Sequence, residues 1–544
     1  MERQILIGGE AGQGVAKAAT ILGKAFVREG FYVFNYRDYP SLIKGGHNFN
    51  VLRISAEPVS SHEFDGHDVV VALDEKTVRK HAGEMKKDAV VLAPNRVNAD
   101  SKLSVDTENI IRELNAPKIM ENIILISAAW KYLGMPFESL EKTILEELKN
   151  NRTAVTAAKR GYEEVETGKV MGTAPEKRAR YFITGSQAVA MGAIAAGIDL
   201  YIAYPMTPAT PVLHYLAAVQ TEYDFQVLQL ENEIAVANAA LGASYAGAMT
   251  MIGTSGGGFA LMGEAMSLQG MSEMPLVAYL AMRNAPSTGV PTYTGQGDLK
   301  MAVNIGHGEY PKVVVAPGDP KEVFERTLEA FYLAYKYRVL SIIISDKHLA
   351  ESTYTVDGFS PRVEPERFIV EDVPEDYKSY EITETGVSPR AVPGQGDAPV
   401  RATSYEHDEY GYTREEGEWA IKMNDKRFRK VRYIKEEVAS LEPVNTYGNG
   451  DKVIVSWGST KGAILDALKQ LDGWRFVQVS YIEPFPAEQF LDAVEGAERI
   501  VLVENNVTGL LGDIIAEKTG MIIEEKILRY DARPFTPKYI IRRL

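Results

Sequence analysis

Short apolar runs alternate with stretches of helical hydrophobic spacing along most of the chain. Apolar runs of about four to eight residues, bounded by glycine, proline or charged residues, are typical of buried strands. The amphipathic stretches between them are typical of helices that cover a sheet. Strands and helices in regular alternation indicate parallel sheets with helices on their faces. The pattern therefore predicts an α/β protein, and the length of 544 residues predicts several such domains.

The first block of alternating elements covers residues 1–165 and is predicted to form a parallel sheet. The sequence then turns polar without a long apolar run, and residues 166–180 are expected to be a linker. The strands of the first domain are predicted at Gln4 to Gly8, Asn48 to Ser55, Val69 to Leu73, Ala89 to Ala93 and Ile123 to Ile126.

Two further α/β blocks cover residues 181–350 and 446–544. Residues 351–445, between them, are acidic and rich in proline and glycine, and we expect an extended arm or lid packed over a neighbour. The strands of the second domain are predicted at Tyr201 to Tyr204, Phe225 to Leu228, Met249 to Gly253, Leu276 to Met282, Val313 to Ala316 and Leu340 to Ser345. Those of the third are predicted at Lys452 to Trp457, Phe476 to Ser480 and Arg499 to Glu504.

Composition argues against several classes of function. The 74 acidic and 59 basic residues give a net charge of -15, which argues against nonspecific binding to nucleic acid. The chain has no cysteine, so it is not expected to hold an iron-sulfur cluster or a disulfide, and the second absence fits a cytoplasmic protein. Met1 to Gln4 lack a signal-peptide layout, and no apolar run approaches the ~20 residues of a membrane span. We therefore expect no membrane association.

The stretch from Tyr204 to Pro211 is the most distinctive of the chain, because three prolines follow an apolar run and fix a stiff turn. Its hydroxyls, on Thr207 and Thr210, are expected outside the carboxyl end of a strand, where α/β sheets bind ligands. The structural alternative is a rigid loop whose threonines only cap the helix that starts near Pro211.

This turn resembles the Tyr-Pro-Ile-Thr-Pro-Ser-Thr-Pro signature of the alpha subunit of 2-oxoacid:ferredoxin oxidoreductases. Other motifs of that family follow in the family's order, and nearly the whole chain looks like its fused gamma-alpha form. They are Thr184 to Ala188, Glu231 to Ala235, Thr254 to Phe259, Pro286 to Thr292 and Gln296 to Leu299. The resemblance implies a gamma-type α/β domain, a thiamin-pyrimidine-binding-type α/β domain and a transketolase-C-like α/β domain.

Glu233 opens a helix of small residues that can pack closely and shield its carboxyl group from water. Thiamin enzymes need a shielded carboxyl against the pyrimidine nitrogen of the cofactor. The alternative is a first-turn glutamate favoured by the helix dipole. By resemblance, the cofactor-activating glutamate falls on Glu233, with Glu231 the less favoured neighbour, and Tyr204 and Pro205 are expected beside thiamin diphosphate.

Arg283 follows the apolar strand that ends at Met282, where a guanidinium can hold a 2-oxoacid carboxylate by two hydrogen bonds. The alternative is an exposed arginine at the rim. The resemblance places substrate contacts on Arg283 and Thr207. Tyr293 and Gly295 stand where the family more often has Lys or Arg and Glu or Gln, so the identity of the 2-oxoacid is left open.

A glycine-rich turn from strand into helix contains Gly12 and Gly14, whose N–H groups could approach a phosphate. A plain tight turn is the alternative. The resemblance adds coenzyme A as a co-substrate without locating it. Lys44 replaces an arginine of the family's gamma part, and His47, which lacks a second ligand at metal spacing, is interpreted as a structural or rim histidine.

The sequence lacks the Gly-Asp-Gly motif with which thiamin enzymes hold Mg²⁺, so no metal site is expected on this chain. A beta subunit is expected to supply the Mg²⁺, the diphosphate anchor and the iron-sulfur cluster. The resemblance implies a heterotetramer of two alpha and two beta chains that decarboxylates a 2-oxoacid of the 2-oxoglutarate or pyruvate class, forms acyl-CoA and reduces ferredoxin. The alternatives are a noncatalytic nucleotide-binding or scaffold subunit and a non-redox thiamin enzyme.

The run Glu406 to Glu409, Glu-His-Asp-Glu, contains four metal-ligand types in succession. Four consecutive side chains cannot all face one ion, so a solvated charged turn is the favoured interpretation. The family shows the same element, but no chemical role follows from the sequence.

Overall fold

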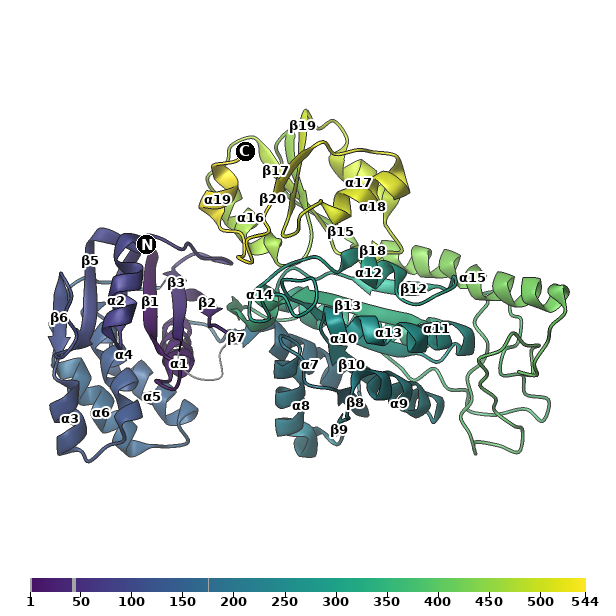
Figure 1. Cartoon of the computed structure of the whole chain (residues 1–544), viewed down its shortest axis with the longest axis horizontal. Coiled ribbons are helices and arrows are strands. Elements are labelled where there is room, and N and C mark those ends of the chain that lie inside the picture. The colour runs from purple at the N-terminus through teal and green to yellow at the C-terminus, as the bar shows by residue number, and fades with distance from the viewer. Residues whose placement is uncertain (1, 42–45, 175) are drawn as a thin grey trace.

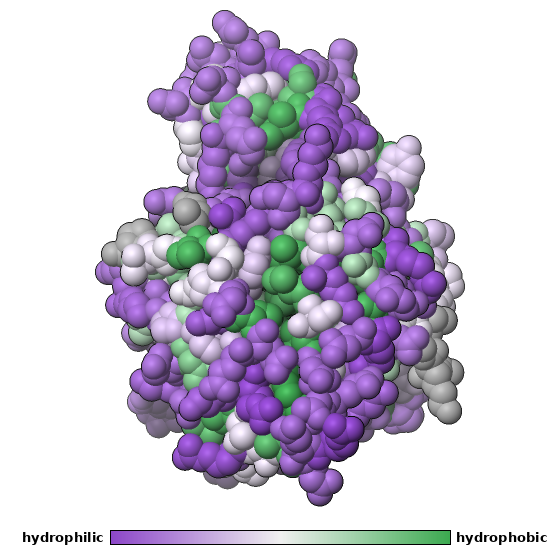
Figure 2. Space-filling model, turned by 90° about the vertical axis from the view of Figure 1, so that its left-hand side faces the viewer, coloured by the Kyte–Doolittle hydropathy of each residue, from purple (hydrophilic) through white to green (hydrophobic). Residues whose placement is uncertain are grey.

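The computed structural model describes residues 2–41, 46–174 and 176–544. The expectation for Lys44 lies outside these residues. The chain forms three lobes, each built on one sheet, and a long arm runs beside the central lobe (Figure 1). The side of the molecule seen in Figure 2 is mostly hydrophilic. None of the described helices is long and apolar enough to cross a membrane.

The first sheet has the strand order β6-β5-β4-β1-β3-β2-β14-β7. Its strands are β1 (Glu2–Glu10), β2 (Tyr32–Asp38), β3 (His47–Ser55), β4 (His67–Ala72), β5 (Met85–Pro94), β6 (Lys102–Val105), β7 (Tyr181–Thr184) and β14 (Thr353–Val356). The helices of this lobe are α1 (Val15–Arg28), α2 (Glu75–His81), α3 (Thr107–Glu113), α4 (Glu121–Tyr132), α5 (Phe137–Glu147) and α6 (Arg152–Glu163), with single 3₁₀ turns at Ala82–Glu84 and Lys118–Met120.

The prediction of a parallel first sheet is wrong for half of it. Strands β1, β4, β5 and β6 are parallel, whereas β3 runs antiparallel to both β1 and β2. Only eight residues separate β2 from β3 in the chain, and a parallel pair needs a connection of a dozen or more residues. Strand β14 then pairs antiparallel with β2, and β7 pairs antiparallel with β14.

The predicted strand at Ile123 to Ile126 is also wrong, because these residues lie in helix α4. All residues from Glu121 to Trp130 are buried. A helix that is buried on every side has no polar face, so its sequence lacks the 3.6-residue period and reads like a buried strand.

The second sheet has the order β18-β12-β13-β11-β10-β8-β9. Its strands are β8 (Leu200–Ala203), β9 (Gln226–Gln229), β10 (Thr250–Thr254), β11 (Leu276–Met282), β12 (Lys312–Val315), β13 (Leu340–Asp346) and β18 (Tyr481–Glu483). Its helices are α7 (Gly185–Ala195), α8 (Thr210–Tyr223), α9 (Glu233–Tyr245), α10 (Gly256–Leu261), α11 (Gly263–Ser272), α12 (Leu299–Asn304), α13 (Pro320–Tyr337) and α14 (Lys347–Glu351). The six strands predicted here are confirmed to within about a residue at each end.

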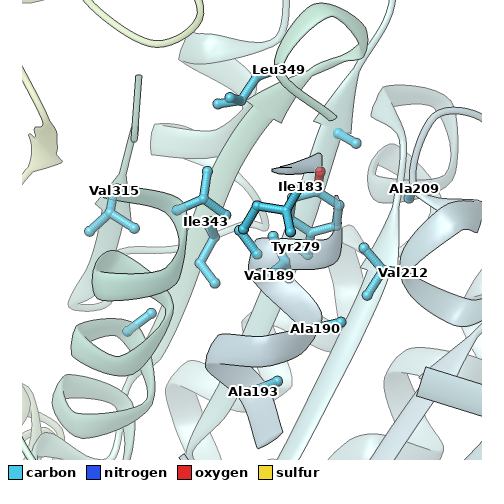
Figure 3. Packing of buried hydrophobic residues seen from close by; sticks show 14 of the residues in the cluster. Ile183, Val189, Ala190, Ala193, Ala209, Val212, Tyr279, Val315, Ile343 and Leu349 are labelled. Carbon is cyan, nitrogen blue, oxygen red and sulfur yellow. The ribbon is translucent and has the colours of Figure 1, made fainter. Parts of the chain in front are cut away.

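Helices cover both faces of the second sheet, because successive residues of its strands point to opposite sides. Tyr279 of β11 packs among Val189, Ala190 and Ala193 of α7 on one face (Figure 3). Leu280 of β11 joins the core formed with α9, α10 and α11 on the other face. This layering leaves the carboxyl ends of the parallel strands free to carry a site.

The third sheet has the order β15-β17-β16-β19-β20 and is parallel except for β15. Its strands are β15 (Val444–Gly448), β16 (Lys452–Ser456), β17 (Trp474–Val479), β19 (Arg499–Glu504) and β20 (Glu525–Leu528). The helices around it are α16 (Thr460–Leu468), α17 (Ala487–Val494), α18 (Leu510–Thr519) and α19 (Pro537–Ile541). Strand β18 leaves this lobe to pair with β12, so the two lobes share a sheet.

The arm runs from β14 to β15 and is irregular until helix α15 (Gly417–Ser440), which the sequence did not indicate. Buried ion pairs join this helix to the central lobe: Nζ of Lys426 lies 2.6 Å from the Glu273 carboxylate, and Lys430 contacts its other oxygen. Burial alone would raise the pKa of Glu273, but these ammonium groups bring it well below its usual value. Glu273 therefore stays ionised and anchors the arm.

The interpretation of Glu406 to Glu409 as a solvated turn is wrong. His407 is fully buried and Asp408 nearly so. Nη2 of Arg427 donates to Glu406 at 2.7 Å and Nη2 of Arg414 donates to Asp408 at 2.6 Å. These acids fold the arm onto itself, and their partners lie too far along the chain to be read from the run.

Candidate functional site

Four of the sequence motifs meet at one edge of the second sheet. Strands β11, β10, β8 and β9 are neighbours and run parallel. Parallel strands end at the same edge, where open α/β sheets bind their ligands. Arg283 follows β11, the Thr254 to Phe259 motif follows β10, the Tyr204 to Pro211 turn follows β8, and Glu233 comes after β9. Motifs spread over some eighty positions therefore form one site.

Glu233 is the first residue of α9 and is only 3% exposed. Asn232 caps the helix by accepting from the Ala235 N–H at 2.9 Å, so the carboxyl of Glu233 is not needed as a cap. Its Oε1 is buried and has no hydrogen-bond partner among the residues that the structure describes. A buried polar atom without a partner costs free energy unless a ligand supplies one, so this carboxyl group fits the pyrimidine side of a thiamin site.

The glycine-rich turn after β10 packs directly on Glu233. A Cβ atom at Gly258 would lie 2.6 Å from Oε1 of Glu233 and 2.2 Å from Oγ1 of Thr254. Neither group has room to move into the buried core, so only glycine fits there. Gly257 is different, because a Cβ there would meet nothing within 4 Å.

Gly258→Ala is expected to lower turnover by ~10- to 100-fold, because a misplaced catalytic group loses its alignment with the reacting partner. Gly257→Ala is the matched control, since the neighbouring methyl group enters open space, and it should retain wild-type turnover. Initial rates and thermal unfolding of both variants in the complete enzyme check the prediction. Equal turnover in the two variants would show that the Glu233 carboxyl does not depend on this contact.

The proline turn presents its hydroxyls rather than using them as caps. Helix α8 begins at Thr210, its N-cap residue is Ala209, and among the described residues no side chain caps it. The capping alternative for the threonines is therefore not supported. Tyr204 is 38% exposed, and Pro205 and Thr207 are half-buried, so the turn lines an open edge of the sheet.

Arg283 lies beside this turn, and its Nη1 donates to the carbonyl oxygen of Thr207 at 3.0 Å. Among the described residues no carboxylate forms an ion pair with it. Burial lowers the pKa of Arg283, and the nearby Asp298 opposes that shift. Burial likewise raises the pKa of Asp298. A partly desolvated guanidinium without a paired carboxylate is suited to bind an anionic ligand.

Residues 284–298, which we name the substrate loop, are held by contacts that sequence reasoning missed. The Tyr293 hydroxyl donates to Asp38 of the first lobe at 3.0 Å. The Thr294 hydroxyl donates to Asp346 of the second sheet at 2.9 Å. Gln296 is bonded to the third lobe. The sequence of the loop does not indicate these partners, because each lies far from the loop in the chain.

Gly12 and Gly14 lie at the end of β1 in the first lobe, on a different sheet from Glu233. Both have positive φ, and Gly14 forms the N-terminal cap of α1. The Asn122 side chain donates to the Gln13 carbonyl at 2.9 Å and holds the turn. The structure thus shows a glycine-dependent turn at a helix N-terminus and leaves the phosphate expectation open.

His47 is not a rim residue, because it is buried and its Nε2 lies 2.8 Å from Nε2 of His81. His67, His81 and Glu84 bring possible ligand atoms within 4.8 Å of one another. However, Nδ1 of His67 lies 3.0 Å from Nε2 of Gln4, whose amide orientation is fixed by two backbone bonds. Nδ1 must accept there, so His67 presents an N–H toward Glu84 instead of a lone pair to a metal.

Comparison with known proteins shows which protein families the chain matches. Residues 4–164 match the family model described as "Pyruvate ferredoxin/flavodoxin oxidoreductase", and residues 191–425 match "Pyruvate flavodoxin/ferredoxin oxidoreductase, thiamine diP-bdg". The 2-oxoacid:ferredoxin oxidoreductase subunit alpha of Saccharolobus solfataricus is 31% identical over 97% of this chain and 95% of its own length. The 2-oxoglutarate synthase subunit KorA of Methanothermobacter thermautotrophicus is 30% identical over 66% of this chain and 97% of its own.

A solved structure is similar over the whole chain. It is the 2-oxoglutarate:ferredoxin oxidoreductase from Magnetococcus marinus with 2-oxoglutarate, coenzyme A and succinyl-CoA bound. The TM-score is 0.89 at 27% identity, and the match covers 100% of this chain and 98% of that chain. The fold and these matches define a thiamin-type oxidoreductase acting on an oxo group. The chain belongs to the family of 2-oxoacid:ferredoxin oxidoreductase alpha subunits, which confirms the resemblance seen in the sequence.

Proposed function

We propose that this chain provides the pyrimidine side of a thiamin diphosphate site and, with a beta subunit, oxidatively decarboxylates a 2-oxoacid to acyl-CoA and CO₂ while reducing ferredoxin. The observation that supports the proposal is the buried Oε1 of Glu233 at the carboxyl edge of the second sheet, which hydrogen-bonds to no group in the described part of the chain. A ligand that hydrogen-bonds to Oε1 would remove the free-energy cost of burying this atom without a partner.

Each residue has a proposed role. Thiamin diphosphate, when bound, supplies an acidic C2–H group whose carbon can attack the oxo carbon. Glu233 shares a proton with the pyrimidine nitrogen, and its burial keeps water from competing. Tyr204 and Pro205 border the pyrimidine, Arg283 holds the substrate carboxylate, and the Thr207 hydroxyl donates to the reacting oxo group.

A beta subunit fits the open edge of the site. Large apolar side chains are exposed in the turn after β8, on β9 and on the helices α9 and α10, which is unusual for a surface that faces water. They are Tyr204 (38% exposed), Leu228 (44%), Ile234 (52%) and Leu261 (55%). The partner proposed for this surface also supplies Mg²⁺ and an iron-sulfur cluster, since the chain has no cysteine to hold a cluster. Two alpha and two beta chains would form the enzyme.

The remaining assignments of domains, acyl acceptor, substrate class and location belong to the same proposal. Residues 1–165 are proposed as a gamma-type domain, 166–180 as a linker, 181–350 as the thiamin pyrimidine domain, 351–445 as an arm and 446–544 as a transketolase-C-like domain. Coenzyme A is proposed as the acyl acceptor, with Gly12 and Gly14 as candidate phosphate contacts. The substrate class proposed is that of 2-oxoglutarate or pyruvate, and the enzyme is placed in the cytoplasm.

Reconstitution tests the proposal. The isolated chain is expected to bind no iron and to oxidise no 2-oxoacid, whereas the complex with its beta subunit should reduce an acceptor dye only when both a 2-oxoacid and coenzyme A are present. A panel of 2-oxoacids then gives the substrate. Stoichiometric iron on the isolated chain, or turnover without the partner, would contradict the proposal that the beta subunit supplies the cluster and the diphosphate anchor.

A further inference from the structure

Gln296 is a fully buried residue of the substrate loop whose polar groups bond to the third lobe. Its backbone N–H donates to the Asn505 carbonyl at 2.8 Å, and its Oε1 accepts from the Asn505 N–H at 2.9 Å. Its Nε2 donates to the Trp457 carbonyl at 3.2 Å, and its own carbonyl accepts from Nδ2 of Asn506 at 3.3 Å. Gln296 thus joins the loop to the third lobe by four hydrogen bonds.

The other side of this contact is itself rigidly held. Nδ2 of Asn506 also donates to Glu504 at 2.7 Å, and Oδ1 of Asn506 accepts from the Gly509 N–H at 2.8 Å. The buried Glu504 carboxylate accepts from the Trp457 indole at 3.0 Å and from the Leu511 N–H at 2.9 Å. Asn505 and Asn506, which sequence analysis did not assign, therefore present fixed partners to the loop.

We call the four hydrogen bonds of Gln296 to the third lobe the clamp. Gln296 lies close in the chain to Arg283, the residue proposed to bind the substrate carboxylate. A Cβ at Gly295 would lie 3.2 Å from the Asn284 Cα and 3.5 Å from the Arg283 carbonyl oxygen, so the loop folds back onto Arg283. On the other side of Gln296, Asp298 packs against Gly256, where a Cβ would lie 2.2 Å from its Oδ2. Movement of Gln296 would carry both neighbours with it.

We propose that Gln296, Asn505 and Asn506 are positioning residues for substrate binding, through which the third lobe holds the Arg283 and Asp298 region in its binding geometry. This inference rests on the proposed function, because it assigns Arg283 to the substrate carboxylate. The third lobe then acts on the reaction without touching the substrate.

Gln296→Met tests the clamp, because it keeps the side-chain length and removes its two side-chain hydrogen bonds. In the complete complex KM for the 2-oxoacid is expected to rise about tenfold, as for the loss of a buried hydrogen bond. Turnover at saturating substrate should change by less than about threefold, since Glu233 is not displaced.

The matched control is Gln478→Met. Gln478 is equally buried, and its Nε2 donates across the same two lobes to Glu322 at 2.7 Å, away from the substrate loop. It should leave KM unchanged. A general loosening of the lobes would instead raise KM in both variants, and that result would overturn the inference.

A double-variant cycle with Arg283→Ala separates positioning from unrelated destabilisation. If the clamp acts through Arg283, Gln296→Met should change kcat/KM by less than about twofold when Arg283 is already absent. Effects that multiply would contradict the proposal. Should Gln296→Met fail to assemble, Asn506→Ala decides the question, with KM expected to rise and an unchanged KM counting against the clamp.

The outcomes keep the two claims apart. A wild-type complex that oxidises no 2-oxoacid rejects the proposed function. An active wild-type complex whose Gln296→Met variant has the same KM rejects only the clamp.

Discussion

Glu233→Gln is expected to lower turnover of the reconstituted complex by ~10²–10⁴-fold, the usual effect of losing a well-placed acid–base group. Glutamine has nearly the same shape, so it preserves packing against Gly258 and assembly with the partner. Its amide cannot exchange a proton with the pyrimidine nitrogen. Turnover at saturating thiamin diphosphate, with the melting temperature measured alongside, checks the prediction.

Glu231→Gln is the matched control for this experiment. Glu231 lies two residues earlier in the same motif and is exposed, so the same substitution should leave turnover near the wild-type value. A large loss in Glu231→Gln with near-normal turnover in Glu233→Gln would exchange the two roles.

Arg283→Ala is expected to lower kcat/KM by about two to three orders of magnitude. A carboxylate that loses a desolvated charged partner forfeits roughly 2–5 kcal/mol, and each ~1.4 kcal/mol corresponds to a factor of ten. The variant also frees the Thr207 carbonyl from its bond with Nη1. Measurement of kcat/KM and of thiamin diphosphate affinity in the same preparations separates substrate binding from cofactor binding.

Arg283→Lys should recover only part of the loss, because an ammonium group keeps the charge without the planar fork. If Arg283→Ala weakens thiamin diphosphate binding while kcat/KM at saturating cofactor stays normal, the arginine is structural. The carboxylate would then bind elsewhere, and the loop around Tyr293 would be the next candidate.

The site motifs could be predicted from the sequence because each is local. A run such as Leu276 to Met282 is long and wholly apolar, so strand β11 was predicted at its observed bounds. Once these strands are taken as parallel, Glu233 and Arg283, which each follow a strand, fall at one sheet edge. The burial of Glu233 also follows from the small residues after it.

Other features depend on contacts between distant segments. The antiparallel half of the first sheet arises partly because β14, more than three hundred residues after β2, pairs with it. In the Glu406 to Glu409 run, Glu406 pairs with Arg427 and Asp408 with Arg414, and both arginines lie outside the run. The partners of Gln296 lie about two hundred residues further along the chain. A local pattern of polar and apolar positions does not predict such pairings.

Exchange of the thiamin C2 proton tests most directly whether Glu233 activates the cofactor. The complex is loaded with thiamin diphosphate, diluted into deuterium oxide without substrate, quenched with acid at short times and analysed by proton NMR. Wild-type complex should exchange the C2 proton at least about a hundredfold faster than Glu233→Gln complex with equal bound cofactor, as expected for loss of an acid–base group. Equal exchange rates in the two complexes would contradict the account.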